Sequence, residues 1–258
     1  MHGALCTERR SIMADEWYEG ASFNRISTFR FGDCDPQKNA TLYSLMKLLS
    51  ELACDDYEGR GLGHAVLKKR SQAMLVSRLA LQIERMPVYG ERVIASTWER
   101  MIKGPFFYRE YEIRKEDGQL LVSGSSLWTL VDPEVREILR PARLVGGNRE
   151  LDPRKSACPD CRRLKKRDDL TPLGERPVYW SDLDANGHVT NAVYGRIATD
   201  FLPEQLRGRT LHSFTINFNL EVHPNETLQI LGAESSEDSY FEQGVTGNDT
   251  HYLCEFKF

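Results

Sequence analysis

The residues best suited to chemistry stand together in one run, at positions 182–191. The run reads DLDANGHVTN, and six of its ten residues are Asp, Asn, His or Thr. The residues before it predict a strand, and the residues after it predict a helix. A helix start offers free backbone N–H groups and a partial positive charge, which acyl transfer can use to stabilise an oxyanion. We therefore place the candidate site at this strand–helix junction.

Two interpretations without catalysis compete for the same run. Asn186-Gly187 is typical of a tight turn followed by a helix cap, which is structure without chemistry. Asp182, Asp184, Asn186 and Gly187 also occupy positions 1, 3, 5 and 6 of a calcium-binding loop, with no Glu at position 12, which is Val193. We expect neither a metal nor a cofactor here.

The chain also resembles itself at an offset of 149 residues. The aligned pairs are Asp33 with Asp182, Asp35 with Asp184, Thr41 with Thr190, Gly59-Arg60 with Gly208-Arg209 and Leu62 with Leu211. A second short match, at another offset, pairs 81–84 with 218–221. Together these matches predict a duplicated structural unit.

Each unit shows the same order of elements. The first is predicted as a strand at 26–32, a helix from 42 that stops at Gly59 and Gly61, and strands at 73–86, 91–102, 106–115 and 119–132. The second is predicted as a strand at 177–181, a helix within 189–207 that ends near Pro203 or Gly208, and strands at 211–221, 226–235, 238–245 and 250–258. One helix followed by about four antiparallel strands, twice, indicates an α+β fold.

A polar segment rich in Pro and Gly, 146–174, separates the units and reads as a linker. We therefore predict domains at 13–145 and 175–258. Between Arg136 and Arg167 there are eleven Lys or Arg against four Asp or Glu. That excess indicates either a solvated linker or a landing surface for an acidic partner. Cys158 and Cys161 form a lone CxxC, which lacks two ligands for zinc and is expected to be a reduced pair.

Composition restricts the protein classes further. The chain has 258 residues, 40% hydrophobic and 28% charged, with six cysteines and a net charge of −4. The cysteines are too few for a disulfide scaffold, and no apolar run reaches the roughly 18 residues of a membrane helix. The negative charge argues against nucleic-acid binding. The start lacks an apolar leader, so we expect a cytoplasmic protein, with residues 1–12 an extension before Met13.

The run Asp184-x-Asn186-x-His188-Val189-x-Asn191 resembles the D-x-N-x-H-V-N-N signature of the acyl-[acyl carrier protein] thioesterases of bacteria and plants. Further similar stretches are Ser77-Arg78-Leu79, Ile83-Glu84, Gly90-Glu91, Trp98, Phe106-Phe107-Tyr108-Arg109 and Ser126-Leu127-Trp128-Thr129-Leu130-Val131-Asp132. The resemblance implies two tandem hotdog domains, each an antiparallel sheet wrapped around one long helix. It also implies hydrolysis of fatty acyl-carrier thioesters to free fatty acids, which ends fatty acid synthesis.

The resemblance further implies a catalytic Glu on the strand after the second helix, and Glu221 matches that place. Several plant members have a Cys next, where this chain has Val222, so a Cys–His mechanism is not available there. The expected base or nucleophile is therefore Glu221 or Asp184, with both assignments open. Either carboxylate would activate water or form a transient anhydride.

The remaining roles follow from side-chain chemistry. His188 is expected to position the water or the thioester and to shuttle a proton, because the ordinary pKa of histidine lies nearest neutrality. Asn186 can donate from its amide. The backbone N–H of Val189, or of a neighbouring residue, is the expected donor to the oxyanion.

The first unit has Gln37 opposite Asn186 and Asn39 opposite His188, so it lacks the imidazole. One active site per chain is therefore expected, in the second unit. The resemblance implies that the first unit supplies the acyl pocket. The expected lining residues, which could also be plain core, are Met46, Leu49, Met74, Val76 and Trp98.

Two alternative functions remain beside hydrolysis of acyl carrier protein thioesters. One is a thioesterase for acyl-CoA, which shares the chemistry. The other is a non-catalytic acyl-binding module, against which the intact Asp-Asn-His-Glu set argues. The expected partner is an acidic acyl carrier protein, and the protein is expected to be a monomer or a homodimer.

Overall fold

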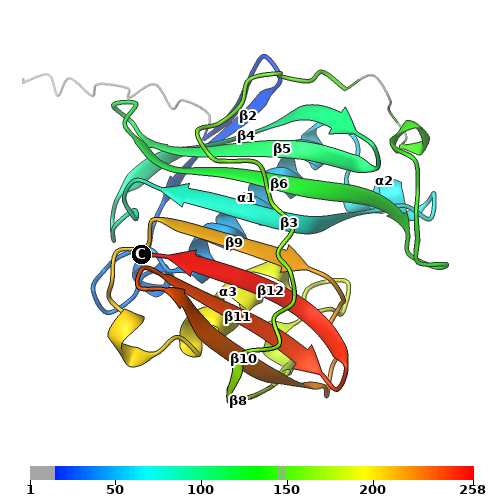
Figure 1. Ribbon diagram of the computed structural model, residues 1–258. Coiled ribbons are helices and arrows are strands. Elements are labelled where there is room, and N and C mark those ends of the chain that lie inside the picture. Colours follow the sequence, from blue (N-terminus) through cyan, green and yellow to red (C-terminus); the bar gives the residue numbers. More distant parts are fainter. Residues whose placement is uncertain (1–14, 145, 147–148) are drawn as a thin grey trace, which may run out of the picture.

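The computed structural model describes residues 15–144, 146 and 149–258 (Figure 1). The predicted extension at 1–12 lies outside these residues, as do residues 13, 14 and 145 of the first predicted domain. Residues 147 and 148 of the predicted linker lie outside them too.

The strands form one 12-stranded antiparallel sheet, in the order β1-β2-β4-β5-β6-β3-β9-β12-β11-β10-β8, with β7 beside β6. The first half contains β1 (Glu16–Glu19), β2 (Ser22–Thr28), β3 (Ala73–Ile83), β4 (Arg92–Lys103), β5 (Phe106–Lys115), β6 (Leu120–Asp132) and β7 (Glu137–Ile138). The second half contains β8 (Thr171–Pro177), β9 (Ser213–Phe218), β10 (Thr227–Ser236), β11 (Ser239–Thr246) and β12 (Asp249–Lys257).

The helices α1 (Leu42–Gly59) and α3 (Asn191–Asp200) pack on each other, on one face of this sheet (Figure 1). A short third helix, α2 (His64–Lys68), follows α1. The α1 helix begins where Thr41 Oγ1 accepts a hydrogen bond from the Ser44 N–H at 3.1 Å, which satisfies a free donor of the first turn. Its apolar stripe, including Leu45, Leu49 and Leu52, is fully buried. None of the described helices is long and apolar enough to cross a membrane.

The two halves join where β3 pairs with β9, from Arg78 opposite Asn217 to Gln82 opposite Ser213. This pairing continues the hydrogen-bond ladder from one half into the other, and one apolar core runs beneath both. Each half is a curved antiparallel sheet wrapped around one helix. The fold is therefore two tandem hotdog domains, as the sequence implied.

The sequence located most elements and misplaced a few. The first helix ends at Gly59 as predicted, and the second ends at Asp200, near Pro203, which was the first of its two predicted stops. The strands predicted at 26–32 and 177–181 are displaced to β2 and β8. Short 3₁₀ helices occupy 31–33 and 180–182 instead. Their aromatic residues, Phe31 and Trp180, which made the sequence look strand-like, are 83% and 87% exposed.

The linker crosses the face of the sheet that is opposite α1 and α3 (Figure 1). On β3, Leu79 and Leu81 pack in the core with the helices, whereas Ala80 packs against Cys158 and Cys161. The thiol of Cys158 donates to the Ala80 carbonyl at 3.3 Å, and that of Cys161 to the Ser125 carbonyl at 2.9 Å. Burial raises the pKa of both thiols to about 12, so each remains a protonated donor at neutral pH.

Candidate active site

One and the same turn precedes the helix in each half. The carbonyl of its first Asp accepts from the N–H of the Thr before the helix. The N–H of its second Asp donates to the carbonyl of the residue four positions later. The distances are 2.9 Å (Thr41 to Asp33) and 2.8 Å (Asp35 to Asn39) in the first half, and 3.0 Å (Thr190 to Asp182) and 2.9 Å (Asp184 to His188) in the second. The duplication predicted from the sequence thus extends to backbone hydrogen bonds.

The carboxylate of Asp184 holds this turn. Its Oδ1 accepts from the N–H of Asn186 at 2.8 Å and from that of His188 at 3.4 Å. Asp35 Oδ1 accepts from the Asn39 N–H at 2.9 Å in the half that lacks the imidazole. Because Asp35 does this without a histidine, part of the role of Asp184 is structural. The turn interpretation of the run therefore describes Asp184, and its catalytic role stays a prediction.

The structure brings His188 and Glu221 together. His188 Nε2 lies 3.6 Å from Glu221 Oε2, and each side chain is 35% exposed. Glu221 lies in the loop after β9, three residues beyond Phe218, and not on the strand as expected. Three backbone bonds hold that loop. The N–H groups of Asn219 and Leu220 donate to the His251 carbonyl at 2.8 and 3.3 Å, and the Val189 N–H donates to the Val222 carbonyl at 3.4 Å.

The hydrogen bond from Val189 to Val222 occupies the N–H group that was predicted to stabilise the oxyanion. Because the Val189 N–H already donates to Val222, it is not free to face a substrate in this structure. The first turn of α3 offers better donors, since the N–H groups that open a helix have no partner within it. They belong to Asn191 and Ala192, the next residues along the helix. The oxyanion donor stays a prediction, for which Asn191 and Ala192 have N–H groups without a described acceptor.

Two histidines outside the 182–191 run also lie at the candidate site. His64 Nε2, at the start of α2, is 3.1 Å from Asn186 Oδ1, across 122 residues of chain. The ring of His223 stands edge-on to that of His188, with centroids 5.7 Å apart. No sequence pattern relates these residues to the 182–191 run, because tertiary contacts alone bring them there.

The thiol of Cys54, on α1, is influenced by the charge of Asp184. Desolvation is the largest cause that raises the pKa of this thiol, and the charges of Asp55, Glu51 and Asp184 add to the rise against Arg109, which lowers it. A raised pKa leaves little thiolate at neutral pH, and the thiolate is the nucleophilic form.

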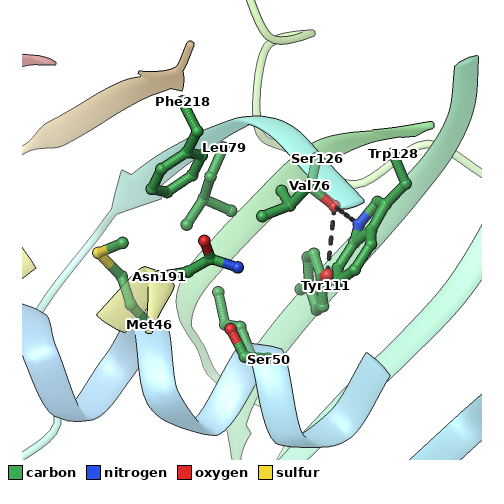
Figure 2. Close-up of a pocket in the computed structure, with 10 residues that line it drawn as sticks. Met46, Ser50, Val76, Leu79, Tyr111, Ser126, Trp128, Asn191 and Phe218 are labelled. Carbon is green, nitrogen blue, oxygen red and sulfur yellow. Dashed lines mark hydrogen bonds between the residues drawn. The ribbon is translucent and has the colours of Figure 1, made fainter. Parts of the chain in front are cut away.

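A pocket opens beside the run and lies mainly in the first half (Figure 2). It is lined by Met46, Leu49, Ser50, Val76, Leu79, Tyr111, Ser126, Trp128, Asn191 and Phe218. The cavity measures only about 10 Å³, room for one water, so any larger ligand must displace side chains to enter. At one wall, Trp128 Nε1 donates to Ser126 Oγ at 2.7 Å, and Ser126 Oγ donates to the Tyr111 hydroxyl at 3.2 Å.

Three of the five expected pocket residues line this cavity: Met46, Leu49 and Val76. Met74 packs against the core instead. The expectation for Trp98 is wrong, because its side chain points to the outer face beneath the linker. There its Nε1 donates to the Arg154 carbonyl at 2.7 Å, and the Arg154 guanidinium stacks 4.1 Å from the ring centroid.

Family models match both halves of the chain. The acyl-ACP thioesterase N-terminal domain matches residues 20–143, and the C-terminal domain matches residues 166–253. The chain belongs to the acyl-ACP thioesterase family. Among solved structures, the 12:0-ACP thioesterase from Umbellularia californica has a TM-score of 0.83 at 22% identity, covering 93% of this chain and 98% of that one. An acyl-ACP thioesterase from Bacteroides thetaiotaomicron has a TM-score of 0.79 at 21% identity, covering 92% and 98%.

Curated members of the family are also similar in sequence. A chloroplastic acyl-[acyl-carrier-protein] hydrolase of Cuphea viscosissima is 26% identical over 242 residues, which is 87% of this chain and 58% of the relative. A chloroplastic palmitoyl-acyl carrier protein thioesterase of Gossypium hirsutum is 25% identical over 252 residues, 92% and 60%. The chain thus spans somewhat more than half of the length of these relatives.

Proposed function

We propose that this protein hydrolyses the thioester of fatty acyl-acyl carrier protein and releases a free fatty acid. The observation that carries the proposal is the His188–Glu221 pair, 3.6 Å apart, next to a mostly apolar pocket. Each partner is tied to the pocket by its own segment. Asn191, three residues after His188, and Phe218, three residues before Glu221, both line it. The apolar chain and the reacting carbonyl would therefore lie side by side.

In the reaction, a carboxylate of Glu221 or Asp184 removes a proton from water as the water attacks the thioester carbonyl. The N–H groups at the start of α3 stabilise the oxyanion that forms. When the oxyanion collapses, the C–S bond breaks, and His188 passes the proton that the carboxylate took from water to the departing thiolate. In the alternative route, the carboxylate attacks directly and forms an anhydride that water then cleaves. No cofactor takes part in either route.

The separation of His188 and Glu221 suits a site that closes around its substrate. At 3.6 Å the two atoms are slightly beyond hydrogen-bond distance, and such contacts often tighten or take up a water when the substrate binds. Asn186, whose Oδ1 already contacts His64, leaves its amide NH₂ to donate to the water or to the carbonyl. Each predicted side chain thus has a role that its position permits.

The carrier-bound thioester is favoured over acyl-CoA because the matched relatives are named as hydrolases of carrier-bound substrates. A purely acyl-binding module would need the pocket but not the Asp-Asn-His-Glu set. The β3–β9 pairing joins two hotdog domains within one chain, so a monomer is sufficient for this site. The domain boundaries and the cytoplasmic location predicted from the sequence remain part of this proposal.

The test is fatty-acid release, measured by mass spectrometry, from a panel of acyl carrier protein thioesters and the matching acyl-CoAs. Wild-type protein should prefer the carrier, and His188→Ala should lose at least about a hundredfold in rate. Asp184→Asn combined with Glu221→Gln should fall below a tenth of wild type. Glu234→Gln, an exposed carboxylate on β10, is the matched control and should stay fully active.

Several outcomes would contradict the proposal. Turnover that survives in the double variant would remove both carboxylates from the mechanism. An absence of hydrolysis, with acyl binding that does not depend on His188, would indicate a binding module. A clear preference for acyl-CoA would keep the chemistry and change the substrate.

A further inference from the structure

A basic segment of the first half lies directly beside the candidate site. The α2 helix begins with His64, whose Nε2 is 3.1 Å from Asn186 Oδ1, and ends at Lys68. Since a helix rises about 1.5 Å per residue, Lys68 lies only about 6 Å along the axis from His64. Lys69 and Arg70 follow at once, and all three cations are exposed.

A second basic segment lies against the first. The Gln72 side chain donates through Nε2 to the Arg143 carbonyl at 2.7 Å, which joins the stretch after α2 to the stretch after β7. Figure 1 shows the two stretches next to each other, at the end of the first domain. Arg140 and Arg143 of this second stretch are exposed. We call Lys68, Lys69, Arg70, Arg140 and Arg143 together the α2 surface.

The α2 surface is unneutralised. Its five side chains form no ion pair with any described residue, and the segments 62–72 and 139–146 contain no Asp or Glu. The adjoining carboxylates include Glu58, which packs against Gly63, and Glu137 of β7 with Asp132 opposite it on β6. The five cations outnumber these three carboxylates, so the area beside the site carries a net positive charge.

The linker, which the sequence also marked as basic, is different. Four of its cations, Arg154, Lys155, Arg162 and Arg167, pair with Asp152, Asp160, Glu255 and Asp169 respectively. Arg163, Lys165 and Lys166 are exposed and form no ion pair with a described residue, so position rather than neutralisation separates them from the α2 surface. It also lies on the face of the sheet opposite α1 and α3. A partner docked on the linker would have the sheet between its acyl group and the site. The structure thus divides the basic stretch 136–167, and only Arg140 and Arg143 belong to the α2 surface.

We propose that the α2 surface is the docking site for the acidic acyl carrier protein, oriented so that its thioester arm reaches His188 and Glu221. This inference rests on the proposed function and names the partner surface of the same site. Cations without internal partners can attract an acidic protein without first breaking ion pairs. Exposed apolar side chains beside them, Val66 at 36% and Ile138 at 61%, provide contact area once the carrier has arrived.

The test compares two triple charge reversals of equal size. Lys68→Glu, Lys69→Glu and Arg70→Glu remove the α2 charge, while Arg163→Glu, Lys165→Glu and Lys166→Glu make the same change in exposed linker cations. Each protein is assayed with one acyl group on three carriers: acyl carrier protein, CoA and uncharged pantetheine. His64 stays intact in all of them.

The α2 variant should lose about tenfold or more in kcat/KM for the carrier protein, with pantetheine turnover unchanged. The linker variant should match wild type on all three substrates. Added salt should lower wild-type turnover of the carrier and have little effect on the α2 variant, because screening weakens the same attraction.

Four results would overturn the proposal. The first two are an unchanged kcat/KM in the α2 variant and an equal loss of kcat/KM on all three substrates. The third is a shared loss on carrier protein and CoA, which would indicate a general anion effect. The fourth is a loss in the linker variant instead of the α2 variant. If wild type hydrolyses no thioester, the proposed function fails, and the docking surface is then decided by binding. In that case, only the α2 variant should bind acyl carrier protein with a higher Kd than wild type at low salt. An unchanged Kd would reject the surface.

Discussion

Gly195 of α3 packs so closely on Met46 of α1 that a Cβ at position 195 would lie 2.6 Å from the Met46 sulfur. The same Cβ would lie 3.3 Å from Cγ of Leu42. This contact is part of the helix packing that joins the two domains, and the Met46 side chain also lines the pocket. The pocket lies mainly in the first domain, and its shape therefore depends on Gly195, on the helix of the second domain, having no Cβ.

Gly195→Ala should shorten the preferred acyl chain. The added methyl must displace the flexible end of Met46, which has the pocket beside it, at a cost of about 1–3 kcal/mol in stability. The measurement is fatty-acid release from a panel of chain lengths. Adding Met46→Ala should restore the longer chains, because it removes the displaced side chain. An unchanged chain-length profile in Gly195→Ala would show that Met46 moves elsewhere.

His64→Ala should lower kcat on the uncharged pantetheine thioester by about twofold to tenfold, the effect of losing one exposed hydrogen bond to Asn186. KM should change little, because His64 orients Asn186 and does not hold the acyl chain. His64→Gln should recover part of the rate, since its amide can donate to the same oxygen. His212→Ala, at another exposed histidine, serves as the control. Equal rates in the Ala and Gln variants would remove His64 from the site.

Two substitutions of Asp184 should separate its structural role from its chemical role. Asp184→Ala removes the acceptor of two backbone N–H groups, so the free energy of unfolding should fall by about 1 kcal/mol. Asp184→Asn keeps an acceptor and should unfold like wild type in urea, yet it should lose activity because the charge is gone.

Asp35 provides the matched control for this pair of variants. It makes the same turn bond without the imidazole, so Asp35→Asn should keep both stability and activity. An Asp184→Asn variant with full activity would leave Asp184 only the structural role and assign the carboxylate chemistry to Glu221.

Glu242 should make stability depend on pH. Burial raises the pKa of this carboxyl well above its usual range, and Tyr252, which donates to it at 2.6 Å, only partly offsets that rise. The folded state therefore keeps a proton that the unfolded chain releases above about pH 4. Its contribution is fully present below that pH and is lost as the pH rises toward the folded-state pKa.

Glu242→Gln removes this titration and keeps an oxygen that accepts from Tyr252. In urea unfolding the variant should match wild type near pH 4 and gain stability over it increasingly as the pH rises toward the folded-state pKa of Glu242. Glu234→Gln, on an exposed position of the same sheet, controls for the change of charge. A constant difference across the pH range would mean that Glu242 is ionised in the folded protein.

Local sequence patterns were sufficient to predict the helices and strands that bury one regular apolar face. The first helix was predictable because its apolar residues recur every three or four positions and Thr41 caps it. The strands predicted at 26–32 and 177–181 were misplaced because Phe31 and Trp180 are residue types that are common in strands. Only the side-chain bonds of Asp33 and Asp182 to the backbone, at 2.7 and 2.8 Å, reveal the short turns formed there.

The sequence by itself determined the duplication and the polar run before the second helix, because these depend on residue type and short spacing. The resemblance to the family added Glu221 to the proposed set of Asp184, Asn186 and His188. Tertiary structure alone decided that His64 and His223 adjoin this set, that Trp98 faces the linker, and that only part of the basic stretch lies near the site. Such relationships arise where β3 meets β9 and α1 meets α3. Pairing between distant segments follows from burial of a shared core, and no local spacing encodes it.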